Sequence, residues 1–290
     1  MAKALLVGCG DLGTALAARL VAAGHRVIAL KRSPPAHLLP GVDYRRADLT
    51  REAPDLADAT FDQAFVILAP GARDAAAYQA LYGDGVARLA AALAGRVGRW
   101  FFVSSTSVYG QCDGEWVDED SATEPATATA RWLLAAERRL AESGAPATAV
   151  RFSGIYGPGR ERLLRQIAAG EPVPYDPPVY TNRIHRDDCV GILELLHRHA
   201  LEGLTLAPLY LASDDCPAPL GTVARGLASA LGVPPPPPGP GNGGQNKRCR
   251  NDRIKALGYR FRFPDWRAGY LPLIAARRVV ESAAAREGNT

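Results

Sequence analysis

The chain has 290 residues, of which 47% are hydrophobic and 22% are charged, the balance of an ordinary globular protein. This length exceeds that of a single hydrophobic core, so we expect one large domain and a smaller lobe. The net charge of +4 is small and forms no basic block, which argues against a nucleic-acid-binding protein. No stretch approaches 18 uninterrupted apolar residues, so a membrane span is excluded as well.

The first two thirds of the sequence alternate short apolar runs with longer helical patterns. This alternation predicts βαβ units and a parallel sheet. The expected strands cover residues 4–7, 27–30, 43–46, 64–68, 100–103 and 148–152. The expected helices cover residues 12–23, 74–93 and 131–142. The predicted fold class is therefore α/β, a Rossmann-type doubly wound parallel sheet.

The pattern loosens in the last third, which predicts a small C-terminal substrate lobe. Helices are expected over residues 160–169, 188–201 and 220–231, the last being the final long helix, and a late strand over 209–212. Residues 171–178 are rich in proline and predict a loop, and the run 234–244 predicts a polyproline spacer that leads into a flexible loop. We place the dinucleotide-binding domain at 1–155 and the lobe mainly at 156–290, with segments of about 181–212 returning to the first domain.

The cysteines are scattered and form no CxxC pair. There are five of them, and the N-terminal residues predict no signal peptide. An odd number of dispersed thiols is typical of a reducing compartment, so we expect a cytoplasmic protein. No spacing of His, Cys, Asp and Glu predicts a metal site, since His197 and His199 lie two apart on an expected helix and face different ways.

A glycine motif follows the first expected strand directly and opens the first expected helix. It comprises Gly8, Cys9, Gly10, Asp11, Leu12 and Gly13. In a GxGxxG motif at this position, the first glycine makes a tight turn, the second admits a pyrophosphate and the third lets helix and strand pack closely. The helix N-terminus then favours the phosphates. The motif predicts a dinucleotide site.

The end of the second expected strand predicts which nicotinamide cofactor binds. An NAD site places Asp or Glu there, whereas this strand runs into Lys31, Arg32 and Ser33. Two cations and a hydroxyl suit a 2′-phosphate, so we expect NADP, with NAD less favoured. Further cofactor contacts are expected after the third and fourth strands, from Asp48, Leu49, Ala69, Pro70 and Gly71.

Three further motifs resemble the extended short-chain dehydrogenase/reductase superfamily, which contains the NAD(P)-dependent epimerases and dehydratases. They are residues 104–110 (SSTSVYG), 155–159 (IYGPG) and 182–188 (NRIHRDD). Together with the glycine motif, this combination is most similar to the atypical, YeeZ-like branch. The resemblance spans nearly the whole chain and implies Ser104 at the cofactor and Ser105 at the substrate oxygen.

The chain departs from the superfamily at two catalytic positions. The resemblance implies a Tyr acid/base and a Lys four residues later, but Thr129 and Leu133 stand there, and residues 111–155 contain neither Tyr nor Lys. Because a threonine hydroxyl is far less acidic than a phenol, another group must transfer the proton or no transfer occurs. Besides Ser105, we keep Tyr109 and Tyr156 as catalytic candidates. His185 stands before an expected helix cap at 187–188, which favours a structural role.

Two classes of function follow from these observations. The first is an NADP-dependent oxidoreductase or epimerase/dehydratase-like enzyme that acts on a small molecule, such as a nucleotide sugar or a carbonyl compound. The second is a non-catalytic NADP-binding sensor or regulator, which the missing Tyr and Lys favour. A homodimer is kept as an option, and no nucleic acid or membrane is expected as a partner.

Overall fold

The computed structural model of the chain describes residues 1–33, 37–241 and 245–287. The chain divides into two compact units. Unit 1 comprises Met1–Tyr109, Ala122–Phe152 and Val190–Leu211. Unit 2 comprises Gly110–Ser121, Ser153–Cys189 and Ala212–Thr290. The segment Gly110–Ser121 therefore clusters with unit 2, although the sequence analysis placed it in the first domain.

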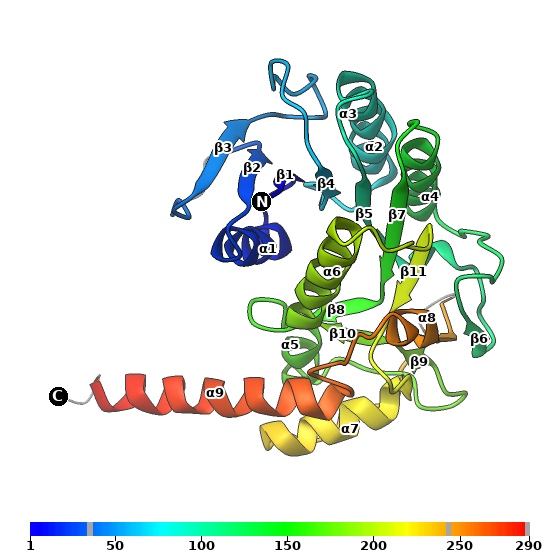
Figure 1. Cartoon of the computed structure of the whole chain (residues 1–290). Helices are drawn as coiled ribbons and strands as arrows, with labels where there is room; N and C mark the ends of the chain where they lie inside the picture. The colour runs from blue at the N-terminus through cyan, green and yellow to red at the C-terminus, as the bar shows by residue number, and fades with distance from the viewer. Residues whose placement is uncertain (34–36, 242–244, 288–290) are drawn as a thin grey trace. The chain divides into compact units, whose positions relative to one another are not determined.

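Unit 1 is built on a central sheet that has seven strands in the described part of the chain (Figure 1). In chain order these strands are β1 (Lys3–Val7), β2 (Arg26–Lys31), β3 (Val42–Arg46), β4 (Gln63–Val66), β5 (Trp100–Ser105), β7 (Ala147–Phe152) and β11 (Leu209–Ala212). Their spatial order is β11-β7-β5-β4-β1-β2-β3, and the pairings from β3 through β7 are parallel. The order reverses between β1 and β4, as in doubly wound folds. The predicted fold class is confirmed.

Helices cover both faces of this sheet. They are α1 (Asp11–Ala22), α2 (Ala75–Tyr78), the π-helical segment η1 (Gln79–Gly85), α3 (Val86–Ala92), the short 3₁₀ turn η2 (Thr106–Val108), α4 (Ala128–Ala141) and α6 (Arg186–Leu201). Figure 1 shows α1 and α6 on one face and α2, α3 and α4 on the other. An ion pair of 2.8 Å between Arg19 and Glu194 joins α1 to α6. Because both faces are covered, β4 is buried along its whole length.

The predicted elements of unit 1 agree with the structure to within three residues, with one change of kind. The expected helix over 74–93 is a continuous helical run, but its middle third is the π-helical η1. Asp74 caps this run by accepting a hydrogen bond of 2.8 Å from the Ala77 amide. The helix expected from residue 131 begins at Ala128 instead, because Thr127 accepts a capping bond from the Ala130 amide.

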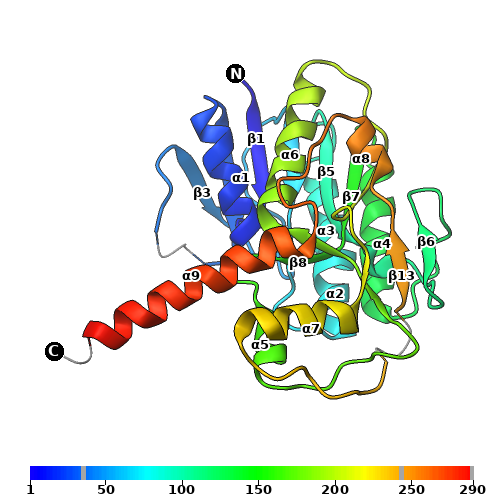
Figure 2. The same ribbon diagram turned by 90° about the horizontal axis from the view of Figure 1, so that it is seen from below.

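Unit 2 contains short strands and a helical core. The elements are β6 (Glu115–Val117), β8 (Gly154–Tyr156), α5 (Arg162–Ala168), β9 (Tyr180–Thr181), β10 (Arg183–His185), β12 (Ala218–Pro219), α7 (Leu220–Leu231), β13 (Lys247–Cys249), α8 (Asp252–Ala256) and α9 (Trp266–Glu287). The strands pair as β10-β8, β12-β9 and β13-β6. Figures 1 and 2 show α5, α7 and α9 side by side, and their buried core includes Leu164, Val223, Trp266 and Tyr270.

Two expectations for the last third need correction. The helix over 220–231 is present with those bounds, but it is not the final long helix, because the 22-residue α9 follows it. Pro272 lies inside α9, where a proline removes one backbone hydrogen bond and so discourages a helix prediction. The two- and three-residue strands of unit 2 were not expected at all.

The proline-rich run is held more firmly than a free spacer. Residues 234–241 form neither helix nor strand, as predicted, and Asn242–Gly244 lie outside the described residues. The Val173 amide donates to the Pro237 carbonyl at 3.0 Å, and the Gly239 amide donates to the Val173 carbonyl at 2.9 Å. The hydroxyl of Tyr175 donates to the Pro236 carbonyl at 2.8 Å. The run is therefore tied to the loop over 171–178.

Candidate functional site

The three glycines of the first loop have different surroundings. Gly8 has φ +93°, and a Cβ there would lie 2.2 Å from the Ile67 carbonyl oxygen. A Cβ at Gly13 would lie 2.4 Å from the Gly8 carbonyl oxygen. At Gly10, by contrast, a Cβ would meet no atom within 4 Å. Packing therefore requires the first and third glycines, while the second faces open space.

The other residues of this motif point into the protein or along the helix. Leu12 is buried in the core, and Asp11 is exposed in the first turn of α1. Cys9 is buried, with its Sγ atom 3.6 Å from the Thr14 hydroxyl oxygen. Burial and the neighbouring Cys9 raise the pKa of Tyr44, so this phenol also lies against the thiol. The buried Cys9 side chain therefore anchors the loop through its contacts with Thr14 and Tyr44.

A cavity of about 320 Å³ opens beside this loop, at the carboxyl ends of β1, β2 and β4. Eight of the predicted cofactor residues line it: Gly8, Cys9, Gly10, Lys31, Arg32, Ser33, Leu49 and Ala69. Six more residues complete the wall: Val7, Leu30, Ala47, Ile67, Leu68 and Leu81. The predicted residues outside this wall are Asp11, Leu12, Gly13, Asp48, Pro70, Gly71 and Ser104. The cavity lies at the sheet edge where ligands bind in doubly wound folds.

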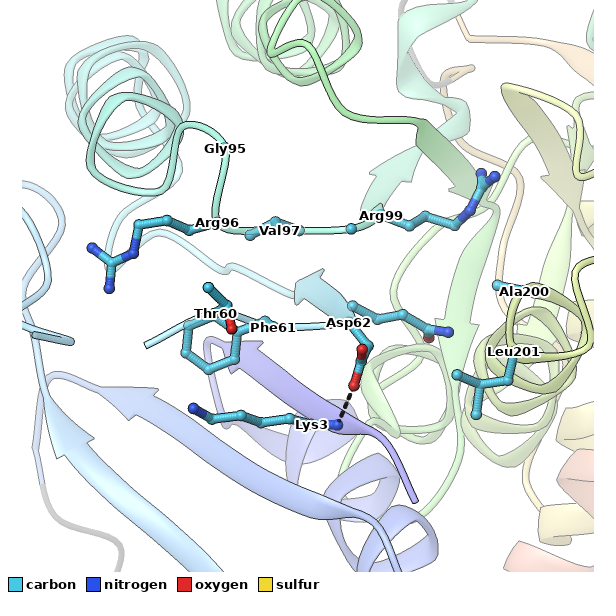
Figure 3. Close-up of a pocket in the computed structure, with 12 residues that line it drawn as sticks. Lys3, Thr60, Phe61, Asp62, Gly95, Arg96, Val97, Arg99, Ala200 and Leu201 are labelled. Atoms are coloured by element: carbon cyan, nitrogen blue, oxygen red, sulfur yellow. Dashed lines mark hydrogen bonds between the residues drawn. The ribbon is translucent and has the colours of Figure 1, made fainter. Parts of the chain in front are cut away.

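A larger hollow of about 630 Å³ lies at the opposite, amino-terminal ends of the strands (Figure 3). Arg96 lines it, but its guanidinium donates to the carbonyls of Leu56, Ala59 and Ala92. The Lys3 ammonium lies over the Phe61 ring, 5.0 Å from its centroid. In Figure 3, Arg96 and Arg99 point in opposite directions. Since these cations hold the local fold and do not converge, we assign no function to this hollow.

Two cations stand at the end of β2. The Lys31 ammonium donates to the Cys9 carbonyl at 3.2 Å, so it reaches back to the glycine loop. The exposed Arg32 lies near the loop after β4, because a Cβ at Gly71 would be 3.7 Å from its Nη1 atom. The Asp48 carboxylate accepts hydrogen bonds from the hydroxyl and the amide of Thr50, within its own turn. These bonds and the nearby positive charge of Arg32 lower the pKa of Asp48.

The two serines after β5 have different partners. Ser104 is buried, and its hydroxyl donates to the Glu137 carboxylate at 2.5 Å. The half-buried Ser105 accepts a bond of 3.1 Å from the Ser107 amide, which caps η2. That bond uses an oxygen lone pair of Ser105 and leaves the hydroxyl hydrogen to donate elsewhere.

A buried ion pair supports this turn. Arg151 makes two bonds to the Glu137 carboxylate, of 3.0 and 2.6 Å, and both side chains are less than 10% exposed. The guanidinium lies over the Tyr109 ring, 4.9 Å from its centre. Tyr109 is fully buried, so its phenol belongs to this internal network.

The positions expected for Tyr and Lys lie on α4 and serve the helix itself. The Thr129 hydroxyl is 3.0 Å from the Thr127 hydroxyl at the helix cap. Leu133 is buried in the core, 6% exposed. Neither side chain supplies a charge or an acidic proton at this place.

Tyr156 belongs to unit 2, whereas Ser105 and Tyr109 belong to unit 1. Its ring stacks on Tyr270 with centroids 4.1 Å apart, and its hydroxyl donates to the Asp265 carbonyl at 3.4 Å. Burial, followed by nearby carboxylates such as Asp214, raises the pKa of Tyr156 above its ordinary value. A Cβ at Gly269 would clash with the Tyr156 hydroxyl, so this contact is tightly packed. In unit 2 this phenol is a protonated core residue.

The helix cap expected at 187–188 is wrong. The helix α6 already begins at Arg186, and the His185 Nδ1 atom accepts a bond of 3.2 Å from the Asp187 amide. Asp188 is fully buried and accepts bonds from the Tyr259 hydroxyl and from two amides at 262 and 263. His185 is therefore the capping group, and the structural role favoured for it agrees with this contact.

No three His, Cys, Asp or Glu side chains in the described part of the chain are grouped so that they could hold a metal ion. No helix there combines the length and the apolar character needed to cross a membrane.

The chain is similar to known proteins over most of its length. Residues 4–202 match the model of the NAD dependent epimerase/dehydratase family. Protein YeeZ of Escherichia coli K12 is 30% identical over 278 residues, which cover 91% of this chain and 97% of YeeZ. A structure from Methylobacillus flagellatus, classed as an NAD-dependent epimerase/dehydratase, is 37% identical with a TM-score of 0.80, covering 96% of this chain and 99% of that one.

A third similar structure carries ligands. It is MoeE5 in complex with UDP-glucose and NAD, with 27% identity, a TM-score of 0.78 and coverage of 96% of this chain and 99% of that one. Family model, curated relative and solved structures agree with one another. The chain belongs to the NAD dependent epimerase/dehydratase family, within the extended short-chain dehydrogenase/reductase superfamily, and is a homologue of YeeZ.

Proposed function

We propose that unit 1 binds a nicotinamide dinucleotide in the cavity beside the glycine loop. The observation that carries this proposal is the contrast between Gly10, which faces open space, and the tightly packed Gly8 and Gly13. No side chain caps the N-terminus of α1 there, and the amides and dipole of a helix N-terminus favour a phosphate group. The NAD named in the MoeE5 complex supports the same class of cofactor.

Within that class, the proposal is NADP rather than NAD. Lys31 and Arg32 line the cavity, and no carboxylate occurs among residues 30–33 to accept bonds from ribose hydroxyls. A 2′-phosphate placed there would meet two cations, and charge-assisted hydrogen bonds are the stronger ones. The MoeE5 complex contains NAD, so this preference is a property we propose for the present chain.

For chemistry, the proposal assigns the substrate oxygen to Ser105. Its hydroxyl hydrogen is not used by the bond from the Ser107 amide and can polarise a carbonyl. When bound, a nicotinamide would supply the hydride donor or acceptor. Tyr109 is buried beside Arg151 in unit 1, and Tyr156 is buried against Tyr270 in unit 2. We propose that each phenol serves the packing of its own unit rather than proton exchange with substrate.

The proposed substrate class is a nucleotide sugar or a carbonyl compound. The UDP-glucose in the MoeE5 complex supports the former. The second candidate function is a non-catalytic NADP-binding sensor or regulator. It is favoured by the contact of Thr129 with the capping Thr127 and by the core packing of Leu133, since neither position retains acid–base chemistry.

A screen of nucleotide sugars and carbonyl compounds by NADPH absorbance tests the two functions against each other. For the enzyme, Ser105→Ala should lower turnover about tenfold or more while NADP affinity stays within twofold, and Ser105→Thr should restore part of the rate. Ser107→Ala, in the same turn, is the matched control. If NADP binds with the expected preference but no compound is turned over, the regulator is the better proposal. If neither cofactor binds, both proposals fail.

A further inference from the structure

One helical run holds two separate loops of the cavity wall by their backbone carbonyls. The Tyr82 hydroxyl in η1 donates to the Leu68 carbonyl at 2.8 Å. The Arg88 guanidinium in α3 donates to the Leu49 carbonyl at 2.7 Å. Leu68 and Leu49 both line the cavity, and Leu81 of the same run lines it as well. Leu81, Tyr82 and Arg88 of this run therefore all serve the cavity wall.

The path of this run is fixed by two glycines. A Cβ at Gly83 would lie 2.9 Å from the Trp132 ring of α4, and a Cβ at Gly85 would lie 3.0 Å from the Leu49 carbonyl oxygen. Both glycines lie in the π-helical η1, and π-helical turns occur frequently at functional sites. The run therefore packs closely against both α4 and the loop after β3. A shift of the run would displace the cavity wall.

The hydrogen bond from Tyr82 acts where the sheet no longer fixes the chain. β4 ends at Val66, so no strand ladder fixes the Leu68 carbonyl. Tyr82 is buried, and its ring packs against Phe102 with centroids 6.1 Å apart. Burial raises the pKa of this phenol, so it keeps its proton and remains a donor. The Tyr82 hydroxyl therefore holds the loop after β4 through its bond to the Leu68 carbonyl.

Both held loops lie near Arg32. Arg32 lowers the pKa of Asp48, which precedes Leu49, and it approaches Gly71 in the loop that contains Leu68. We infer that Tyr82 and Arg88 are positioning residues that hold the part of the dinucleotide site surrounding the 2′-phosphate. This inference rests on the proposed function of the cavity, and it concerns residues that no glycine or charge motif identifies.

The test measures binding to Tyr82→Phe and Arg88→Met. Each variant removes one donor and keeps most of the packing, so the Kd of NADP should rise about three- to tenfold. Adenosine 2′,5′-bisphosphate, which represents the adenosine half of NADP with its 2′-phosphate, should lose affinity by the same factor. Hydrogen exchange without ligand should quicken in peptides that contain residues 49–50 and 68–69. Arg88→Lys should restore part of the affinity.

The control is Tyr78→Phe, on the adjacent helical turn, where the described residues show no hydrogen bond from the phenol. It should bind both probes like the wild type. Titrations are run well below the melting temperature of every variant. Unchanged Kd values in Tyr82→Phe and Arg88→Met, even with reduced thermal stability, would overturn the inference and leave the proposed function standing. A wild type that binds neither probe would overturn both.

Discussion

The Lys31 ammonium donates to the Cys9 carbonyl at 3.2 Å, which joins the end of β2 to the middle of the glycine loop. A positive charge is thereby held beside the loop that we propose for the pyrophosphate, and Arg32 follows it in the same cavity wall. The position of the Lys31 ammonium is thus fixed by the Cys9 backbone carbonyl, which follows the neighbouring strand β1. This relationship leads to the first prediction.

NADP(H) should bind at least about tenfold more tightly than NAD(H). Bonds to charged groups contribute roughly 1.5–3 kcal/mol each, and one such bond to the 2′-phosphate accounts for this factor. Calorimetric titration of both cofactors measures it. The double variant Lys31→Ala, Arg32→Ala should bind the two cofactors alike, chiefly by losing affinity for NADP. Equal affinities in the wild type would contradict the prediction.

Alanine at two glycines of the same loop should have different effects on stability. Gly10 has φ −83° and open space around its Cβ position, so Gly10→Ala should change the free energy of unfolding by less than about 0.5 kcal/mol. It should nevertheless weaken NADP binding, because the methyl group enters the space proposed for the pyrophosphate.

Gly13→Ala is the matched comparison. Its Cβ would lie 2.4 Å from the Gly8 carbonyl oxygen, so the loop and α1 must separate, at a cost of about 1–3 kcal/mol or more. Urea unfolding and cofactor titration of both variants check the contrast. Equal stability losses in the two variants would show that the loop is packed differently.

The sequence predicts the glycine loop and the cations at β2 because both depend on a few consecutive residues. The strand at Leu209–Ala212 and the helix at Leu220–Leu231 were predicted with their observed bounds for the same reason. By contrast, Leu81 and Leu68 enter the cavity wall through tertiary packing, and neither carries a local signal. The two- and three-residue strands of unit 2 depend on partners distant in sequence, such as β8 and β10, so periodicity cannot reveal them.

Removing one partner of the buried Arg151–Glu137 pair should be strongly destabilising. Arg151→Met leaves the Glu137 carboxylate buried without its cation and should cost about 3–5 kcal/mol. Adding Glu137→Leu should recover much of this loss, because a well-packed apolar pair can replace a buried ion pair. A double-mutant cycle by urea unfolding measures the coupling. A loss below about 1 kcal/mol for Arg151→Met would mean that the pair is solvated.

His197 should make the fold sensitive to acid. Burial, then the neighbouring His25, lowers the pKa of His197 to about 4, while its Nδ1 atom lies 2.6 Å from the Gln63 amide oxygen. The folded state therefore binds fewer protons than the unfolded state, whose imidazole has a pKa near 6.5, so stability falls as the pH drops below about 6.5 and continues to fall until about 4. His197→Asn keeps a neutral donor near the Nδ1 position. Unfolding at pH 7 and pH 5 should show a smaller acid loss for this variant, and equal losses would contradict the assignment.

Asp214 should have the opposite effect, weakening the fold as the pH rises. Its side chain is buried, and burial raises the pKa of its carboxyl to about 8, against 3.8 in the unfolded chain. The folded state therefore holds a proton that the unfolded state releases. The stability that depends on this proton is fully present below about pH 4 and is lost as the pH rises through 8. Between pH 5 and 8 the loss should be roughly 3–4 kcal/mol, since each of these units corresponds to at most 1.36 kcal/mol. Asp214→Asn has no such proton, so its stability relative to the wild type should increase with pH over this range.

Asp215→Asn is the matched control: its carboxylate is partly exposed and bonds to Asn251 and Lys255, so its removal should cost about the same at pH 5 and pH 8. Parallel stability curves for Asp214→Asn and the wild type would show that Asp214 is ionised throughout this range and that its charge is compensated in the fold.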